Sequence, residues 1–289
     1  MRYGLFVWLA LLCACDAINP EEPAPAFARL EAPLLVEDGD TFQNVVPDVW
    51  LFQGNDYYGT FVPPTRLPFV RVEEAGRNKL FAQAGVWRNF DSQSHAAYPF
   101  MRFDTLRQQL SLGQSVSFQP VFRYFPDTLI EYAYDENFER QDQALQPFNP
   151  TRLDTANLRR TTLGPFRGAA CGVVHFDADR TYFDVVSTGT LDLPRGTSPV
   201  WAEVKFRGNI RFAFALVAEG FGITDGEMPL LLMTDGYTDD GQWRAAYFDL
   251  TNYLSIGFPG ARFRARLFAI SDGSDRSLYL DDIRILHFQ

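Results

Sequence analysis

Three aromatic residues in the C-terminal half of the chain, Trp201, Trp243 and Tyr247, have positions from which they could bind a sugar. In 200–207 and in 243–250 apolar residues alternate with polar or aromatic ones, and successive strand residues point to opposite faces of a sheet. All three rings therefore fall on faces directed away from the core. Flat sugar rings stack on aromatic side chains, and such sites add a few polar groups. The pattern predicts a glycan-binding surface, unless a loop, the preceding domain or a partner protein covers the rings.

Two arginines, Arg264 and Arg266, would supply polar groups to that surface. In 262–269 the apolar residues share one face, and the arginines form a stripe on the other. Guanidinium groups donate hydrogen bonds to sugar hydroxyls and to acidic groups. The alternative is a solvated arginine row that acidic side chains balance.

Catalytic chemistry finds little support in this sequence. It has no Gly-x-Ser-x-Gly elbow, no phosphate-binding loop and no His-Glu-x-x-His motif. The histidines, His95, His175 and His287, are too scattered for metal-ligand spacing. Cys171 lies in an apolar stretch and is predicted to be a small buried residue. We therefore expect a binding protein that is not an enzyme.

The composition predicts an all-β fold. The 289 residues are 46% hydrophobic and 15% aromatic, with 18 Pro and 21 Gly, a combination typical of strands joined by turns. The net charge of −10 argues against nucleic acid or anionic lipid as the main partner.

The N-terminus reads as an export signal. Met1-Arg2 precedes a continuous apolar run over 5–12, which is too short to cross a bilayer. The run ends in Leu12-Cys13-Ala14-Cys15, which resembles the bacterial lipobox. That resemblance implies cleavage before Cys15, acylation of this residue and anchoring in the outer membrane; an ordinary secretory signal is the alternative. Residues 1–14 are then the signal peptide, and the Pro-rich, acidic stretch 15–33 is a tether.

The first domain is expected over 34–126 as an Ig-like β-sandwich. An apolar run at 49–52, a turn at Gly54-Asn55-Asp56 and a second run to Val62 have the chemistry of a hairpin. The region resembles a group of uncharacterised bacterial lipoproteins. The matching stretches are Asp48-Val49-Trp50-Leu51-Phe52, Gly59-Thr60-Phe61, Ala84-Gly85-Val86 followed by Asn89, and Tyr98-Pro99-Phe100.

The second domain, 127–289, resembles the jelly rolls of carbohydrate-binding (galactose-binding-like) modules, on the residues 134–139 and 278–285. The resemblance implies a structural calcium ion near Glu136, Asp281 and Asp282, completed by backbone carbonyls. The alternative is that the aspartates hold backbone amides in a bulge. Such a bulge at Asp281-Asp282 is expected, since Leu280 and Ile283 are an odd number of residues apart. No other cofactor is expected.

Two functions compete on this evidence. The first is a membrane-anchored, non-catalytic lipoprotein that docks on an outer-membrane protein complex. The second is a cell-surface module that binds glycans. The first predicts a flat apolar surface, and the second predicts the three aromatic rings together in an open groove.

Overall fold

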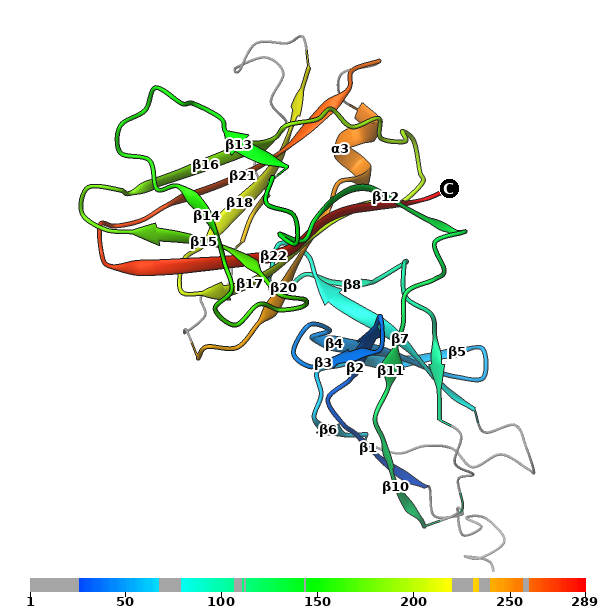
Figure 1. The fold of residues 1–289 in the computed structure, drawn as a ribbon. Coiled ribbons are helices and arrows are strands. Elements are labelled where there is room, and N and C mark those ends of the chain that lie inside the picture. Colours follow the sequence, from blue (N-terminus) through cyan, green and yellow to red (C-terminus); the bar gives the residue numbers. More distant parts are fainter. Residues whose placement is uncertain are drawn as a thin grey trace, which may run out of the picture.

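The computed structural model describes residues 26–67, 79–106, 111, 113–142, 144–219, 231–233, 240–256 and 260–289. These residues form strands and one short helix, α3 (Thr251–Ile256), so the predicted all-β class is confirmed. No described helix is long and apolar enough to span a membrane. Figure 1 shows two β units, an N-terminal one that runs from blue through cyan to the green β10 and β11, and a larger C-terminal one in green to red.

The N-terminal unit, as we define it, covers the described part of 26–126. Its strands are β1 (Phe27–Leu30), β2 (Leu34–Glu37), β3 (Asp40–Phe42), β4 (Asp48–Gln53), β5 (Asp56–Phe61), β6 (Thr65–Arg66), β7 (Leu80–Trp87), β8 (His95–Ala97), β9 (Asp104–Thr105), β10 (Ser115–Phe118) and β11 (Val121–Phe122). The main sheet has the order β5-β4-β7-β8, with β9 also paired to β7. The predicted hairpin is present, because Gln53 pairs with Asp56 across a turn in which Gly54 has a φ of 63°.

Two small sheets, β10-β1-β6 and β11-β2-β3, complete this unit. Strand β1 lies within the stretch 15–33 for which the sequence predicts a tether, and its Ala28 and Leu30 are fully buried. Their burial, with the pairing of β1 to β10, makes these residues part of the folded body. The chain before Ala26 lies outside the described residues.

The C-terminal unit covers the described part of 127–289 and has two larger sheets. Its strands are β12 (Ile130–Glu136), β13 (Leu145–Pro147), β14 (Leu158–Thr161), β15 (Cys171–Phe176), β16 (Tyr182–Ser187), β17 (Val200–Gly208), β18 (Phe212–Ala218), β19 (Leu231–Leu232), β20 (Arg244–Asp249), β21 (Phe263–Ile270) and β22 (Arg276–Phe288). One sheet has the order β14-β15-β22-β17-β20, with β12 also paired to β22, and the other has the order β13-β16-β21-β18-β19.

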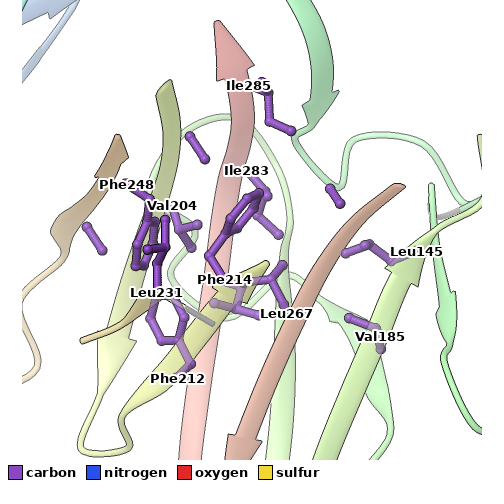
Figure 2. Packing of buried hydrophobic residues seen from close by; sticks show 14 of the residues in the cluster. Leu145, Val185, Val204, Phe212, Phe214, Leu231, Phe248, Leu267, Ile283 and Ile285 are labelled. Carbon is purple, nitrogen blue, oxygen red and sulfur yellow. The ribbon is translucent and has the colours of Figure 1, made fainter. Parts of the chain in front are cut away.

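The core of this unit lies between the two sheets (Figure 2). Alternate residues of β17, β20 and β21 enter it, as the sequence pattern predicts; for example Val204, Phe248 and Leu267 are fully buried there. The rings of Phe214 and Phe248 stack across the sandwich with their centroids 5.5 Å apart. Burial of these apolar faces is what holds the two sheets together.

The predicted bulge in the last strand is present. Glu203 pairs with Arg284 but Lys205 pairs with Asp281, so between these two pairs β22 contains one residue more than β17. Asp282, within the bulge, has a φ of 40°, a left-handed conformation. The extra residue restores the inward facing of Ile283 and Ile285, which are both fully buried.

The N-terminal unit packs against the outer face of the β22-β17-β20 sheet (Figure 1). Trp201, Tyr247 and Leu286 point away from the C-terminal core and belong instead to the hydrophobic cluster of the N-terminal unit. The backbone continues the contact, since the Asn89 amide donates to the Tyr247 carbonyl over 2.8 Å. The two units therefore share one continuous apolar interface, which we call the junction.

Candidate functional site

Two of the three predicted sugar-binding rings lie inside the junction. Trp201 is 4% exposed and Tyr247 is 1% exposed, so for these two rings the alternative of a covered face applies and the open sugar-binding surface does not form. The ring of Tyr98, from the N-terminal unit, lies 5.5 Å from Trp201 and 5.0 Å from Tyr247. The Tyr247 hydroxyl donates to the Val45 carbonyl over 2.8 Å. The faces were assigned correctly, and the preceding domain covers them.

Trp243 is half-buried and lies outside that cluster. Its indole N–H donates to the Gly164 carbonyl over 3.1 Å, and its ring meets Phe166 edge-on at 5.9 Å. Arg207 lies over the same ring at 5.2 Å. Trp243 thus packs against the loop after β14, so the three rings do not form one groove.

A buried polar network accompanies the covered rings. Glu203 and Lys205 are fully buried on the outer face of β17, and the Lys205 ammonium donates to Glu203 over 2.8 Å. Tyr124, from the N-terminal unit, donates to the same carboxylate at 2.8 and 3.0 Å, and Tyr98 donates as well. Burial by itself would raise the pKa of Glu203, but the charges of Lys205 and Arg284 hold it below its ordinary value. The junction therefore contains an ionised, hydrogen-bonded carboxylate.

Arg264 and Arg266 lie on the other sheet, away from Trp201. Arg266 is 7% exposed, and its Nε and Nη2 donate to the two oxygens of Asp184 at 2.7 and 2.8 Å. Arg264 Nε donates to the Ser187 carbonyl over 2.7 Å. The predicted solvent-exposed stripe is wrong for Arg266, which belongs to a buried bidentate pair beside Phe148.

The three acids expected around calcium have separate partners. Glu136 accepts backbone amides from Phe138 and Ala144, whereas Asp281 accepts those of Phe166 and Arg167.

Asp282 pairs with the guanidinium groups of Arg167 and Arg284. No group of three acids, histidines or cysteines in the described residues is placed to hold a metal ion. The predicted set therefore does not come together, and Asp281 has the bulge role named as the alternative.

Cys171 is buried and free, as predicted. Burial raises the pKa of its thiol to about 11. A thiol with that pKa is almost entirely protonated at neutral pH, which disfavours nucleophilic chemistry.

A surface that the sequence analysis missed is the outer face of the N-terminal main sheet. Five rings share it and form what we call the aromatic face: Trp50, Phe52, Tyr57, Phe81 and Phe103. Tyr57 is 55% exposed and Phe103 is 53% exposed, while the other three are half-buried. Ring centroids are 5.5 Å apart for Trp50 and Tyr57 and 6.0 Å apart for Phe52 and Phe103. The sequence does contain a signal for this surface, since all four residues of 49–52 are apolar. A strand of that kind has apolar side chains on both of its faces.

A buried acid lies beside the aromatic face. The side chain of Asp48 is inaccessible to solvent and is hydrogen-bonded to Nδ1 of His95. Burial raises the pKa of Asp48, and the bond to His95 opposes this rise. Gly85 makes room for the carboxylate, since a Cβ there would lie 1.5 Å from Asp48 Oδ1.

A polar groove runs along the edge of the junction. One part, about 360 Å³, is lined by Glu37, Arg123, Tyr132 and Arg284 among others. A second part, about 480 Å³, shares Asp38, Asp135 and Arg167 with the first. Ligand sites occur preferentially at such interfaces between domains.

The base of the groove is an ion-pair network. Arg284, whose side chain is 3% exposed, lies 2.6 Å from Glu37 Oε1 and 3.3 Å from Asp282 Oδ1. Arg167 Nη2 lies 3.1 Å from the same Asp282 oxygen. Burial raises the pKa of Glu37, although Arg284 and Lys205 pull it down. The base of the groove is thus charged and its buried charges are paired.

No known protein family matches this sequence, and no curated protein matches it. The fold is similar to solved carbohydrate-binding modules. One is the CBM22-1 xylan-binding domain of Paenibacillus barcinonensis Xyn10C, with 12% identity and a TM-score of 0.37 over 55% of this chain and 96% of that domain.

Two further modules have a similar degree of likeness. The C-terminal family 22 module of Clostridium thermocellum Xyn10B has 14% identity and a TM-score of 0.36, over 53% of this chain and 92% of that module. The module TmCBM61, solved with β-1,4-galactotriose, has 14% identity and a TM-score of 0.32, over 52% of this chain and 93% of its own. These likenesses concern the fold alone.

Proposed function

We propose that this chain is a non-catalytic, lipid-anchored binding protein that docks through its aromatic face onto a partner protein at the outer membrane. The observation that carries the proposal is the aromatic face itself, with two rings more than half exposed on a sheet. Exposed aromatic surfaces that are contiguous mark interaction sites.

The composition of the aromatic face fits a protein partner. Three of its five rings are phenylalanine, which offers no hydrogen bond, and none of the five side chains carries a charge. The energetic centres of protein interfaces are enriched in aromatic residues and depleted of most charged ones. A sheet presents these rings at little cost in entropy, because its backbone is already ordered.

Anchoring through Cys15 would keep this face near the bilayer. The twelve residues from Cys15 to Ala26 include Pro20, Pro23 and Pro25, and an extended Pro-rich segment spans about 3.1 Å per residue. The body would then sit within roughly 35 Å of the lipid surface. Mass spectrometry of the mature protein tests this step, with acyl chains on Cys15 expected and an unmodified N-terminus contradicting it.

Glycan binding at the same face is the second candidate. Trp50 favours it, because its buried indole N–H has no hydrogen-bond partner among the described residues and is flanked by the Tyr57 ring at 5.5 Å. Ring faces combined with N–H donors suit a sugar. A glycan would therefore compete with a protein for one surface.

The double variant Tyr57→Ser/Phe103→Ser tests the proposal. Both side chains are exposed, so the fold should persist, and a stoichiometric partner cross-linked in native membranes should be lost. The matched control is Leu153→Ser/Ile270→Ser, which removes two exposed apolar side chains from the C-terminal unit and should keep the partner. Loss in both variants, or in neither, contradicts docking through this face. Glycan binding that the first variant alone abolishes would favour the second candidate.

A further inference from the structure

The second part of the junction groove is strongly acidic. Its described lining includes the carboxylates Asp38, Asp40, Asp135, Glu139 and Asp282 and one cation, Arg167. We call this region the acidic groove. Arg167 is already engaged, since it pairs with Asp38, Glu37 and Asp282. Arg284, at the adjoining base of the groove, pairs with Asp135 and Asp282. Asp40 and Glu139 are the lining carboxylates that have no ion pair within the described residues.

One of these carboxylates is buried and incompletely paired. The Asp282 side chain is 1% exposed, and both Arg167 and Arg284 approach only its Oδ1. Its Oδ2 is buried and makes no hydrogen bond within the described residues. A buried carboxylate oxygen without a donor is costly, so a ligand that brings a donor to it gains affinity. Glu37 Oε2, at the adjoining base of the groove, is in the same condition.

The geometry disfavours a bare metal ion as the ligand. Calcium needs six to eight oxygens at 2.3–2.6 Å, and no three acids in the described chain converge in this way. A volume of about 480 Å³ suits a molecule rather than an ion. A primary ammonium offers three donors and a compact charge, which matches separated carboxylates.

We propose that the acidic groove binds a ligand carrying primary ammonium groups, with Asp282 at its base and Asp40 and Glu139 at its rim. The ammonium chemistry is shared by linear polyamines and by amino sugars. The site is separate from the aromatic face, which lies on the N-terminal main sheet. Each proposal can therefore be contradicted while the other stands.

The test is calorimetric titration of the full chain in detergent at low salt. The probes are spermidine, a tetramer of β-1,4-linked glucosamine, and the same tetramer fully N-acetylated. We expect saturable binding of an ammonium probe at one site, weakened by added salt, and no binding of the neutral acetylated tetramer. Binding of spermidine alone identifies a polyamine site, and tighter binding of glucosamine tetramer identifies an amino-sugar site.

The variant Asp40→Asn/Glu139→Gln removes two exposed rim charges. The amide oxygen introduced at position 139 can still accept the backbone amides of Ala169 and Ala170, so the fold should be kept. Its affinity for the ammonium probe should fall at least about five-fold. Asp179→Asn/Asp275→Asn removes two exposed acids outside the groove and should leave the affinity unchanged. An equal loss in both variants, equal binding of the acetylated tetramer, or no saturable binding of either ammonium probe would overturn the proposal.

Discussion

Two sheet faces of this molecule look alike in sequence and have opposite surroundings. The outer face of β17 and β20 carries Trp201 and Tyr247, and the N-terminal unit buries both. The outer face of β4 and β5 carries Phe52 and Tyr57, and Tyr57 remains more than half exposed. The difference is that the covered face also carries Glu203, which accepts hydrogen bonds from Tyr124 of the other unit and from Lys205 of its own strand.

In this molecule, charged residues on a strand face do not indicate that the face is exposed to solvent. An exposed face tolerates charges at no cost, so a charged residue beside an aromatic one reads as solvent-facing. Here the charges are paired and hydrogen-bonded inside the junction, while the uncharged aromatic face is the open one. Buried pairs of this kind are held by geometry that only the assembled units provide.

The largest expected effect comes from breaking the buried pair. Lys205→Ala leaves the Glu203 carboxylate buried without its cation and should lower the free energy of unfolding by about 3–5 kcal/mol. Urea denaturation measures this change. The control Arg180→Ala, which breaks the solvent-exposed pair with Asp177, should leave the unfolding midpoint nearly unchanged. Comparable losses in the two variants would contradict the contrast between covered and open surfaces.

A second effect depends on pH and comes from Asp281. Burial, and then the charge of Asp282, raises its pKa from 3.8 to about 7. The folded chain therefore keeps a proton that the unfolded chain has already lost, so this residue makes stability fall as pH rises from about 4 to 7. Relative to the wild type, Asp281→Asn should gain about 2 kcal/mol between pH 5 and pH 7. A pH-independent difference in urea denaturation would show that the residue does not titrate there.

The smallest effect comes from a matched pair of hydroxyl deletions. Tyr247→Phe removes the buried hydrogen bond to the Val45 carbonyl and should cost about 1 kcal/mol. Tyr57→Phe removes an exposed bond to Thr60 and should cost less than about 0.5 kcal/mol. Thermal unfolding of both variants measures the difference. Equal costs would mean that the two faces are equally accessible to water.

Much of the fold was predictable because alternation is a local signal. The inward residues of β17, β20 and β21, the hairpin at Gly54 and the bulge at Asp282 all follow from spacing within one short segment. The predicted sugar-binding surface does not form, because the solvent exposure of a strand face depends on which other part of the chain packs against it. Nothing in 200–207 records that Tyr98, more than a hundred residues earlier, lies 5.5 Å from Trp201.

The acidic groove was beyond sequence reasoning for the same reason. Its described lining comes from separate stretches around Asp38, Asp135, Arg167 and Asp282, and no spacing rule connects them. Asp282 was singled out in the sequence, but for a metal set with Glu136 and Asp281, whose carboxylates bind backbone amides elsewhere.

The sequence by itself determined the all-β class, the two-unit order and, in strands with clear alternation, the side on which each residue falls, because strand geometry sets these within a few residues. The tertiary structure alone decided which of those sides meets water. Long-range contacts cover the β17 face and leave the β4 face open. Which face is covered depends on the total apolar area buried and on the pairing of buried charges, and no single segment of the sequence contains that information.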